Sequence, residues 1–570
     1  MILIIREYLS MLKESGELDA LLTDLIMSMD MKPLSKPQKG ARQYGVDLAA
    51  IGLDPDDDAE KLFLFVIKQG NINRNTWDGQ QQSVRESLNE INDVYLSSML
   101  DKSLQKKRKK IILCSNGDLA QNVRANWVGF KEDKSKHNEI EYDFWGGDAL
   151  SALVEKYLLN EFLFPELVQK QMRKTLAFLD LDDYDLTHFY QLIEELLFNR
   201  DLSKKDQLKI LRLLNLCLNL VFHWAQEANN LKPALLASER LVLRVWDWMR
   251  PKSLFLNKKI FREFCKIFIT QTKIYGNYFK KIQKHCYIED GLYGYRAEQI
   301  EYPLLTFEQI GILGIAGFEF LNHSAMKHEG NKIVVPENVS IVTDSLANLI
   351  HNNKSSYNPL FDGHVIDICL GLLLLNFANR KGEAEQWLSS LFQSIILNYK
   401  LRKKFPILSD SYEDLVDIEV ESTYTNFEAS TLLSVMFEWC VVLNLPNGYR
   451  NARDSVISTF PDVNLQTWYP DEDIEQYMYK GNALVESGSM RHSILLPDDF
   501  NNFKKQILEE LKREEHPDKL SFIINGMPII GLIASRHFRT PVFPFFGARI
   551  SKMNKNKIIP LYKVTKVTRR

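Results

Sequence analysis

The spacing of hydrophobic and polar residues changes near residue 165. Before it, apolar runs of strand length alternate with apolar stripes at helical period. The runs predict strands, and the stripes predict helices. This alternation predicts an α/β domain over 1–165. The expected strands are 44–51, 61–68, 111–115 and 140–144, and the expected helices are 1–13, 16–29, 81–99, 119–126 and 149–159.

After residue 165, long amphipathic patterns of helical period follow one another. They predict a large, mainly α-helical region over 166–450 and a mainly helical or irregular C-terminal region over 451–570. The glycines of the GxxGxxG pattern at 311–317 lie in an apolar run, which favours close helix packing over a nucleotide-binding loop. The segment 535–539, Ser-Arg-His-Phe-Arg, has three possible interpretations: an interface clamp, an anion site or the basic end of a helix.

Two predicted strands, 44–51 and 61–68, are joined by the acidic segment 54–58, a strong turn signal. A turn centred after Asp57 would place Asp47 opposite Lys68 in the antiparallel ladder. A carboxylate beside an ammonium, at the open end of an apolar hairpin, could hold a metal ion and orient a water molecule. This arrangement suits hydrolysis of phosphodiesters.

Composition narrows the class of protein. The 570 residues are 45% hydrophobic and 25% charged, as expected of a soluble protein with several domains. The net charge of -3 gives no global basic field, so any nucleic-acid surface must be local. Six cysteines without a CxxC pair argue against a zinc site or a disulfide framework and favour a reducing cytoplasm. The most apolar runs, 366–378 and 522–534, are shorter than a membrane span, and the N-terminus is a poor signal peptide, so we expect a cytoplasmic protein without membrane contact.

Four local motifs, taken in order, resemble one family of nucleases. They are Gly45-Val46-Asp47-Leu48, Val66-Ile67-Lys68, the apolar strand 111–114 followed by Ser115-Asn116, and the segment 140–150 with its Trp-Gly-Gly-Asp turn. Residues 14–160, about a quarter of the chain, resemble the restriction-endonuclease-like fold and, more narrowly, the Mrr-type branch of the PD-(D/E)xK nucleases. The resemblance implies that the α/β domain has a mixed central sheet flanked by helices. The resemblance implies a metal-dependent DNA endonuclease of the kind found in bacterial anti-phage defence, regulated or docked to partners through its helical region.

The resemblance also implies roles for individual residues. Asp47 would bind Mg²⁺ or Mn²⁺, which prefer hard oxygen ligands. Glu17, or Asp19, on the helix before the hairpin would be the second acid of the site. Lys68 would orient or activate the attacking water and offset charge in the transition state.

One position departs from the family. The Glu or Gln expected two residues before the lysine is Val66, which cannot bind a metal. Three alternatives remain open: Glu17 supplies the missing ligand, Gln69 supplies it through a bulge, or the site is catalytically inactive.

Basic residues flank the predicted site on both sides and could bind the phosphates of double-stranded DNA. The alternative is a solubilising surface. Trp77 and Trp127 could stack on bases or lie in the core. The candidate phosphate-binding residues are Lys36, Lys39, Arg42, Arg74, Lys107 and Arg108.

The resemblance implies several partners. They are double-stranded DNA, a second copy of the chain, because cutting both strands usually takes two sites, and a separate ATPase or sensor protein. The chain itself carries no P-loop motif. Two other functions remain open. One is a catalytically inactive, nuclease-like protein that binds nucleic acid or acts as a scaffold in a defence complex. The other is a helical interaction protein whose N-terminal α/β domain is only structural.

Overall fold

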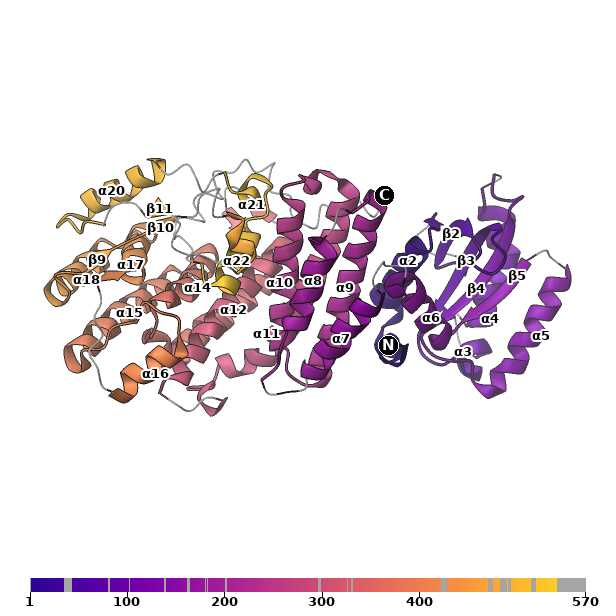
Figure 1. Cartoon of the computed structure of the whole chain (residues 1–570), viewed down its shortest axis with the longest axis horizontal. Helices are drawn as coiled ribbons and strands as arrows, with labels where there is room; N and C mark the ends of the chain where they lie inside the picture. Colours follow the sequence, from indigo (N-terminus) through magenta and orange to yellow (C-terminus); the bar gives the residue numbers. More distant parts are fainter. Residues whose placement is uncertain are drawn as a thin grey trace. The chain divides into compact units, whose positions relative to one another are not determined.

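The computed structural model forms two compact units, one of residues 1–196 with 200–227 and one of residues 197–199 with 228–570 (Figure 1). The first unit therefore extends beyond residue 165, the boundary expected from the sequence. The described residues are 2–34, 44–79, 83–101, 103–137, 140–160, 165–179, 181, 183–199, 202–295, 299–324, 327–329, 332–421, 428–469, 475–481, 489–490, 494–513 and 519–540.

The first unit combines a sheet with helices, as the sequence predicts. Its elements are α1 (Ile2–Met11), η1 (Glu14–Leu18), α2 (Asp19–Ser28), β1 (Lys32–Pro33), β2 (Leu48–Leu53), β3 (Glu60–Lys68), α3 (Arg74–Asp78), α4 (Val84–Glu90), η2 (Ile91–Met99), β4 (Arg108–Ser115), α5 (Gln121–His137), β5 (Ile140–Trp145), α6 (Gly147–Leu153), η3 (Val154–Asn160), α7 (Pro165–Leu179), α8 (Thr187–Leu197) and α9 (Lys204–Glu227).

The five strands form one mixed sheet in the order β1-β2-β3-β4-β5 (Figure 1). β1, β2 and β3 pair antiparallel, whereas β3, β4 and β5 pair parallel. The expected mixed sheet is therefore confirmed. The carboxyl ends of the three parallel strands lie at one edge, which is where ligands bind in open α/β sheets.

Helices cover both faces of this sheet, which explains why β3 and β4 are continuous apolar runs. On one face, Leu64 and Val66 of β3 pack with Trp77 of α3, Leu88 of α4 and Trp127 of α5. On the other face, α2 contacts β2 and α6 contacts β5. Val66 is 0% exposed in this core, so its position belongs to the packing of the unit.

The β2–β3 hairpin closes one residue earlier than expected. Its loop is 55–58, and Asp58 adopts the left-handed conformation with φ 53°, which aspartate tolerates better than most residues. Every pair of the ladder shifts by two residues. Leu48 pairs with Phe65, and Asp47, just before β2, donates its N–H to the carbonyl of the same Phe65 at 2.9 Å, so both residues lie opposite Phe65. The expected Asp47–Lys68 pairing is therefore wrong.

The second unit is mainly helical, as expected. Among the described residues, its α-helices are α10 (Lys232–Met249), α11 (Lys258–Cys286), α12 (Glu301–His323), α13 (Glu337–Asn352), α14 (Val365–Phe377), α15 (Lys381–Arg402), α16 (Tyr412–Glu421), α17 (Thr431–Val442), α18 (Pro446–Thr459), α20 (Phe500–Arg513), α21 (Ser521–Ile524) and α22 (Ile529–Phe538). Its shorter elements are η4 (Leu254–Leu256), η5 (Tyr293–Tyr295), β6 (Lys327–Glu329), β7 (Lys332–Val334), η6 (Lys354–Tyr357), η7 (Asp362–His364), β8 (Ala429–Ser430), β9 (Asn464–Leu465), β10 (Trp468–Tyr469), η8 (Tyr477–Tyr479) and β11 (Ser489–Met490).

Close packing accounts for the glycine pattern of α12. A Cβ atom on Gly314 would lie 2.8 Å from the Cβ of Leu370, and one on Gly317 would lie 2.5 Å from a methyl carbon of Leu374. Both leucines belong to α14. The helix-packing interpretation of GxxGxxG is therefore confirmed.

The basic end of α22 is buried in the second unit. Arg536 donates to both carboxylate oxygens of Glu239, at 2.8 and 2.5 Å, and the His537 ring lies 3.0 Å from the same carboxylate. Glu239 is 0% exposed. The Ser-Arg-His-Phe-Arg segment is thus an internal clamp between α22 and α10.

Two helices, α9 over Asp206–Glu227 and α12, are long and apolar enough to cross a membrane. In each, 72% of the most apolar stretch is buried inside the structure. A helix that is apolar on most sides is also what the core of a large soluble unit requires.

Candidate active site

Asp47 lies where the chain enters the hairpin, directly before β2. Its Oδ2 accepts the backbone N–H of Ile67 at 2.7 Å, and its own N–H donates to the carbonyl of Phe65 at 2.9 Å. The entry turn needs glycine, because Gly45 has φ 80° and a Cβ there would lie 2.1 Å from the carbonyl oxygen of Ser87. Gly45 thus lets the chain pass close to α4 and deliver Asp47 to the edge of β3.

Glu14 is the second carboxylate at this edge. Its Oε2 accepts the backbone N–H of Gln69 at 3.2 Å. Ile67 and Gln69 are two residues apart, so their N–H groups point to the same side of β3, beyond the point where β2 begins. The N–H groups of Ile67 and Gln69 therefore each donate to a carboxylate, and these two nitrogen atoms are about 7 Å apart along the strand.

A turn between α1 and α2 brings Glu14 to the strand. Ser15 is extended and Gly16 has φ 89°, so the helical path is interrupted at these two residues. Oδ1 of Asp19 accepts the N–H groups of Gly16 and Ala20, both at 2.7 Å, and so closes the turn at the start of α2. Glu14 stands before this break, and its carboxylate faces the end of β3.

Lys68 is the last residue of β3 and is partly exposed at the same edge. Among the described residues, no carboxylate oxygen lies within 4.0 Å of the Lys68 ammonium, so the ammonium is not held by a structural ion pair there. Burial raises the pKa of Asp47 to about 6, and the charges of Glu14 and Asp19 add to the rise. The hydrogen bond from Ile67 and the charge of Lys68 act in the opposite direction. Lys68 therefore stabilises the ionised form of Asp47.

Glu17 and Gln69, the other two predicted site residues, lie differently from what the sequence suggests. The Glu17 carboxylate accepts the N–H of Lys13 at 3.0 Å. Burial, and next the charge of Glu17, raise the pKa of Tyr8. Gln69 follows β3 without a bulge, its side chain is exposed, and its backbone binds Glu14. The acid at the hairpin is thus Glu14, which the sequence reasoning missed; the break signalled by Gly16 could have indicated it.

Two of the predicted phosphate-binding residues lie at the far end of the sheet. Arg108 pairs with Lys61 at the start of β3, seven residues or about 23 Å from Lys68. Lys107 forms an ion pair with Glu60, and Arg108 lies 3.8 Å from the carboxylate of Asp57. The structure therefore does not bring Lys107 and Arg108 to the candidate site.

The same far end contains a buried charge network. Lys61, which is 1% exposed, lies within 2.8 Å of carboxylate oxygens of Asp54, Asp57 and Glu141. Lys110 shares the fully buried Asp54, at 3.1 Å. Burial alone would raise the pKa of Asp54, but hydrogen bonds from both lysines lower it below its usual value. Lys61 and Lys110 are thus structural residues of this network.

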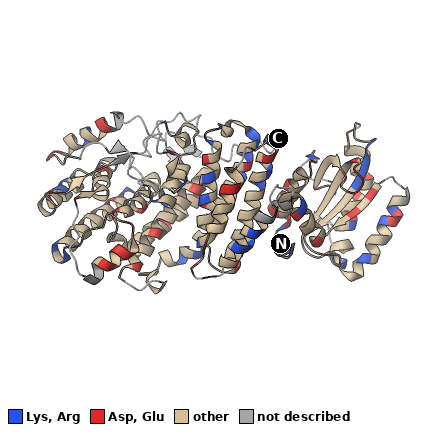
Figure 2. Cartoon of the chain, viewed as in Figure 1, with Lys and Arg blue, Asp and Glu red and all other residues tan. Residues whose placement is uncertain are grey.

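The other four residues predicted to bind phosphate fall into two groups. Arg74 is exposed at the start of α3, six residues after Lys68, whereas Lys36, Lys39 and Arg42 lie outside the described residues. Figure 2 shows Lys and Arg interspersed with Asp and Glu over the helices of both units (Figure 2).

The two tryptophans of the first unit that could have stacked on bases lie in its core. Trp77 is 2% exposed and Trp127 is 7% exposed, and their rings meet edge to face with centroids 6.2 Å apart. The core interpretation of both residues is therefore confirmed.

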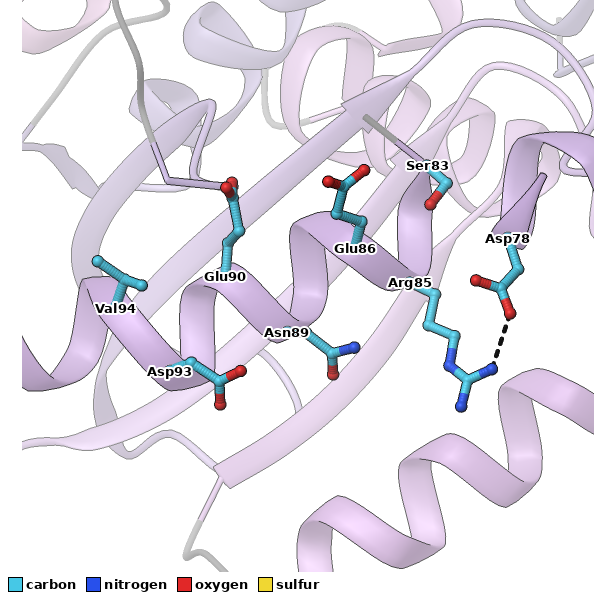
Figure 3. Close-up of a pocket in the computed structure, with 8 residues that line it drawn as sticks. All are labelled: Asp78, Ser83, Arg85, Glu86, Asn89, Glu90, Asp93 and Val94. Atoms are coloured by element: carbon cyan, nitrogen blue, oxygen red, sulfur yellow. Dashed lines mark hydrogen bonds and ion pairs between the residues drawn. The ribbon is translucent and has the colours of Figure 1, made fainter. Parts of the chain in front are cut away.

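An open groove along α4 and η2 is one of the concave features among the described residues of the first unit. Figure 3 shows Glu86, Glu90 and Asp93 along the helix, with Arg85 turned to Asp78 at 2.7 Å (Figure 3). Four acids face one arginine in this groove. Its charge is opposite to that required for phosphates, so a nucleic acid would bind elsewhere.

The donor set at the edge of β3 suits a hard divalent cation. Among the described residues, no group of three or more His, Cys, Asp and Glu side chains converges on one point. Mg²⁺ is nevertheless usually held by one or two carboxylates, together with waters and substrate phosphates. Asp47 and Glu14 provide two carboxylates. Burial raises the pKa of Asp47 and the charge of Glu14 adds to the rise, so a cation would favour the ionised form of Asp47.

No protein-family model, no curated protein and no solved structure matches this chain. Its function is therefore inferred from its residues and their geometry.

Proposed function

We propose that the first unit is a metal-dependent endonuclease that hydrolyses phosphodiester bonds of double-stranded DNA. One observation carries the proposal: Asp47 and Glu14 occupy successive edge amides of β3 beside Lys68, at the carboxyl edge of the parallel strands. Two carboxylates that can hold a cation, next to an ammonium, suit metal-assisted hydrolysis of phosphodiesters. The family resemblance of residues 14–160 supports the same function.

Each of the three residues has a distinct role in this proposal. Asp47 and Glu14 would hold Mg²⁺ or Mn²⁺ through their carboxylates. The bound cation would supply Lewis-acid activation of the phosphate and of a water molecule. Lys68 would donate hydrogen bonds to a phosphate oxygen and offset the negative charge that grows in the transition state. Asp47 must be ionised for this role, which its pKa of about 6 allows at neutral pH.

The second unit would regulate the nuclease or dock a partner, because an unrestrained nuclease would harm the cell that makes it. A second copy of the chain would supply a second site for the second DNA strand. A role in bacterial defence, with a separate ATPase or sensor protein, is what the family resemblance implies. These assignments extend the proposal for the first unit, which can be tested on its own.

The direct test is cleavage of supercoiled plasmid and linear duplex by the full-length protein, with Mg²⁺, with Mn²⁺ and with EDTA. Asp47→Asn and Lys68→Met should abolish cleavage. Lys106→Ala, in the exposed loop before β4 at the opposite end of the sheet, serves as the matched control and should cut normally. Metal-independent cutting, or normal cutting by both site variants, would rule out this nuclease site.

A second candidate function is nucleic-acid binding or scaffolding without catalysis. It is favoured by Val66, which fills the core at the position where the family has a metal-binding Glu or Gln. In that case the full-length protein would retain DNA in an electrophoretic shift assay but leave it intact with every metal. Retention should then decrease as salt increases, because phosphate contacts release counterions.

A further inference from the structure

Asn116 connects two segments that carry the candidate site. It follows β4 directly, is 1% exposed and lies at the carboxyl edge of the sheet. Its side-chain amide donates to the carbonyl oxygens of Leu9 and Leu12, both at 2.8 Å, and its Oδ1 accepts the N–H of Gly70 at 2.7 Å. One buried side chain thus binds both the end of α1 and the turn after β3.

These two segments place the charged groups relative to one another. Leu12 precedes Glu14 by two residues, and Gly70 follows Lys68 by two residues. Glu14 itself binds the amide next to Gly70, that of Gln69, at 3.2 Å. Any displacement of the end of α1 from the turn would therefore move the Glu14 carboxylate relative to Lys68.

The neighbours of Asn116 hold the same turn through the backbone. Ser115 Oγ donates to the carbonyl oxygen of Gly70 at 2.5 Å and accepts the N–H of Gly117 at 3.1 Å. A Cβ on Gly117 would lie 2.4 Å from the carbonyl carbon of Gly70, so the two backbones can approach only with glycine there. The turn that follows Lys68 is therefore enclosed on the side of β4.

Asn116 uses three of its four hydrogen-bonding positions on backbone groups of two segments more than 40 residues away in sequence. The last carbonyl groups of a helix lack the usual partners inside the helix. At the end of α1, the Leu9 carbonyl accepts the N–H of Leu12 at 3.1 Å together with the Asn116 amide, and the Leu12 carbonyl accepts the Asn116 amide. A buried polar side chain with satisfied hydrogen bonds fixes one arrangement of the groups around it.

We propose that Asn116 is a positioning residue of the candidate site, which sets the distance of Glu14 from Asp47 and Lys68 by binding the end of α1 and the turn after β3 together. The effect of Asn116 on catalysis rests on the proposed nuclease function. Asn116 touches neither carboxylate nor the ammonium, so it acts through the two segments that it connects.

The test compares Asn116→Ala with Asn92→Ala in the full-length protein. Asn92 is a matched control in the same unit, because its amide donates to the carbonyl of Leu88 at 2.7 Å and its Oδ1 accepts the Tyr142 hydroxyl at 2.9 Å. These partners belong to the sheet face covered by α4. The two readouts are Mn²⁺ binding, measured by electron paramagnetic resonance, and the separate kcat and KM for DNA cleavage.

We expect Asn116→Ala to weaken Mn²⁺ binding and to lower kcat, each by about 10–100-fold, with an unchanged KM for DNA. Asn92→Ala should match the wild-type protein in Mn²⁺ affinity, kcat and KM, even if its thermal stability falls as much as that of Asn116→Ala. A residue that contributes only stability would show no such difference between the two variants.

Ser115→Ala provides a second variant that removes less of the buried contact. It should loosen the same turn and give intermediate losses of Mn²⁺ affinity and kcat. If Asn116→Ala does not fold, Ser115→Ala tests the positioning role in its place. Normal Mn²⁺ affinity and kcat in these variants would overturn the positioning role and leave the nuclease proposal standing. A wild-type protein that neither binds Mn²⁺ nor cuts DNA would overturn the nuclease proposal, and this role with it.

Discussion

Replacing Asp47 by asparagine should stabilise the first unit at neutral pH, although it removes a residue of the proposed site. The side chain of Asp47 is partly buried and stands near Glu14 and Asp19, and its pKa is raised from 3.8 to about 6. The ionised carboxylate is therefore costly to the folded state. In Asp47→Asn, the amide oxygen can still accept the N–H of Ile67, while the charge is gone.

The size of the effect follows from the pKa. Each pKa unit is worth about 1.4 kcal/mol, so a rise from 3.8 to about 6 corresponds to roughly 3 kcal/mol. The folded state holds this proton more tightly than the unfolded chain. The stabilisation by Asp47→Asn should therefore be absent below about pH 4, grow up to about pH 6 and stay constant above it.

Hydrogen exchange of the β3 amides, followed by mass spectrometry on the full-length protein, measures this stability inside the first unit. At about pH 7.5, a gain of roughly 3 kcal/mol slows exchange on the order of 100-fold after correction for the intrinsic rate. Asp58→Asn is the control, because Asp58 is exposed in the same hairpin and asparagine tolerates its left-handed conformation. Equal or faster exchange in Asp47→Asn would refute the view that Asp47 is a costly buried charge.

Three other predictions concern pH and single carboxylates. Initial rates of plasmid cleavage should fall as the pH drops through about 6, because protonated Asp47 no longer binds a cation; a rate that stays constant to pH 5 would contradict this. Asp54→Asn should cost about 3 kcal/mol, seen as faster exchange of β3, because Lys61 loses its fully buried partner. The stabilising contribution of Asp54, whose pKa is lowered, should also disappear as the pH falls below about 4. Glu239→Gln should cost roughly 3 kcal/mol or more, because Arg536 remains buried without its carboxylate, and faster exchange of α22 would show it.

The strands of the sheet could be predicted because the central strands are short, continuous runs of apolar residues. The runs at 61–68 and 111–115 are buried on both faces, and they appear as β3 and β4. The exact register could not be predicted. The acidic segment between β2 and β3 allows loops of different length, and the left-handed conformation of Asp58 selects one of them.

The second acid of the site was missed for a reason of backbone geometry. A regular helical period over 16–29 directs attention to Glu17 and Asp19. The structure instead interrupts the helical path at Ser15 and Gly16, so that Glu14 meets the amide of Gln69. Side-chain periodicity says little about such a break, although a glycine between two helical stripes is its usual signal.

The surroundings of Lys107 and Arg108 could not be predicted, because β4 begins three residues before the expected strand 111–115, at Arg108. Lys110 then points into the buried network around Asp54. Long-range pairing of lysines in β3 and β4 with acids of the hairpin loop is a tertiary feature, which the composition of a local segment cannot reveal.

The most direct test of the central claim compares two acids three residues apart. Plasmid cleavage with Mg²⁺ should be measured for Glu14→Gln and Glu17→Gln in the full-length protein. The proposed site predicts that Glu14→Gln lowers the cleavage rate by about 100-fold, whereas Glu17→Gln cuts like the wild-type protein. Wild-type cleavage by Glu14→Gln, with loss of cleavage in Glu17→Gln, would contradict the site described here.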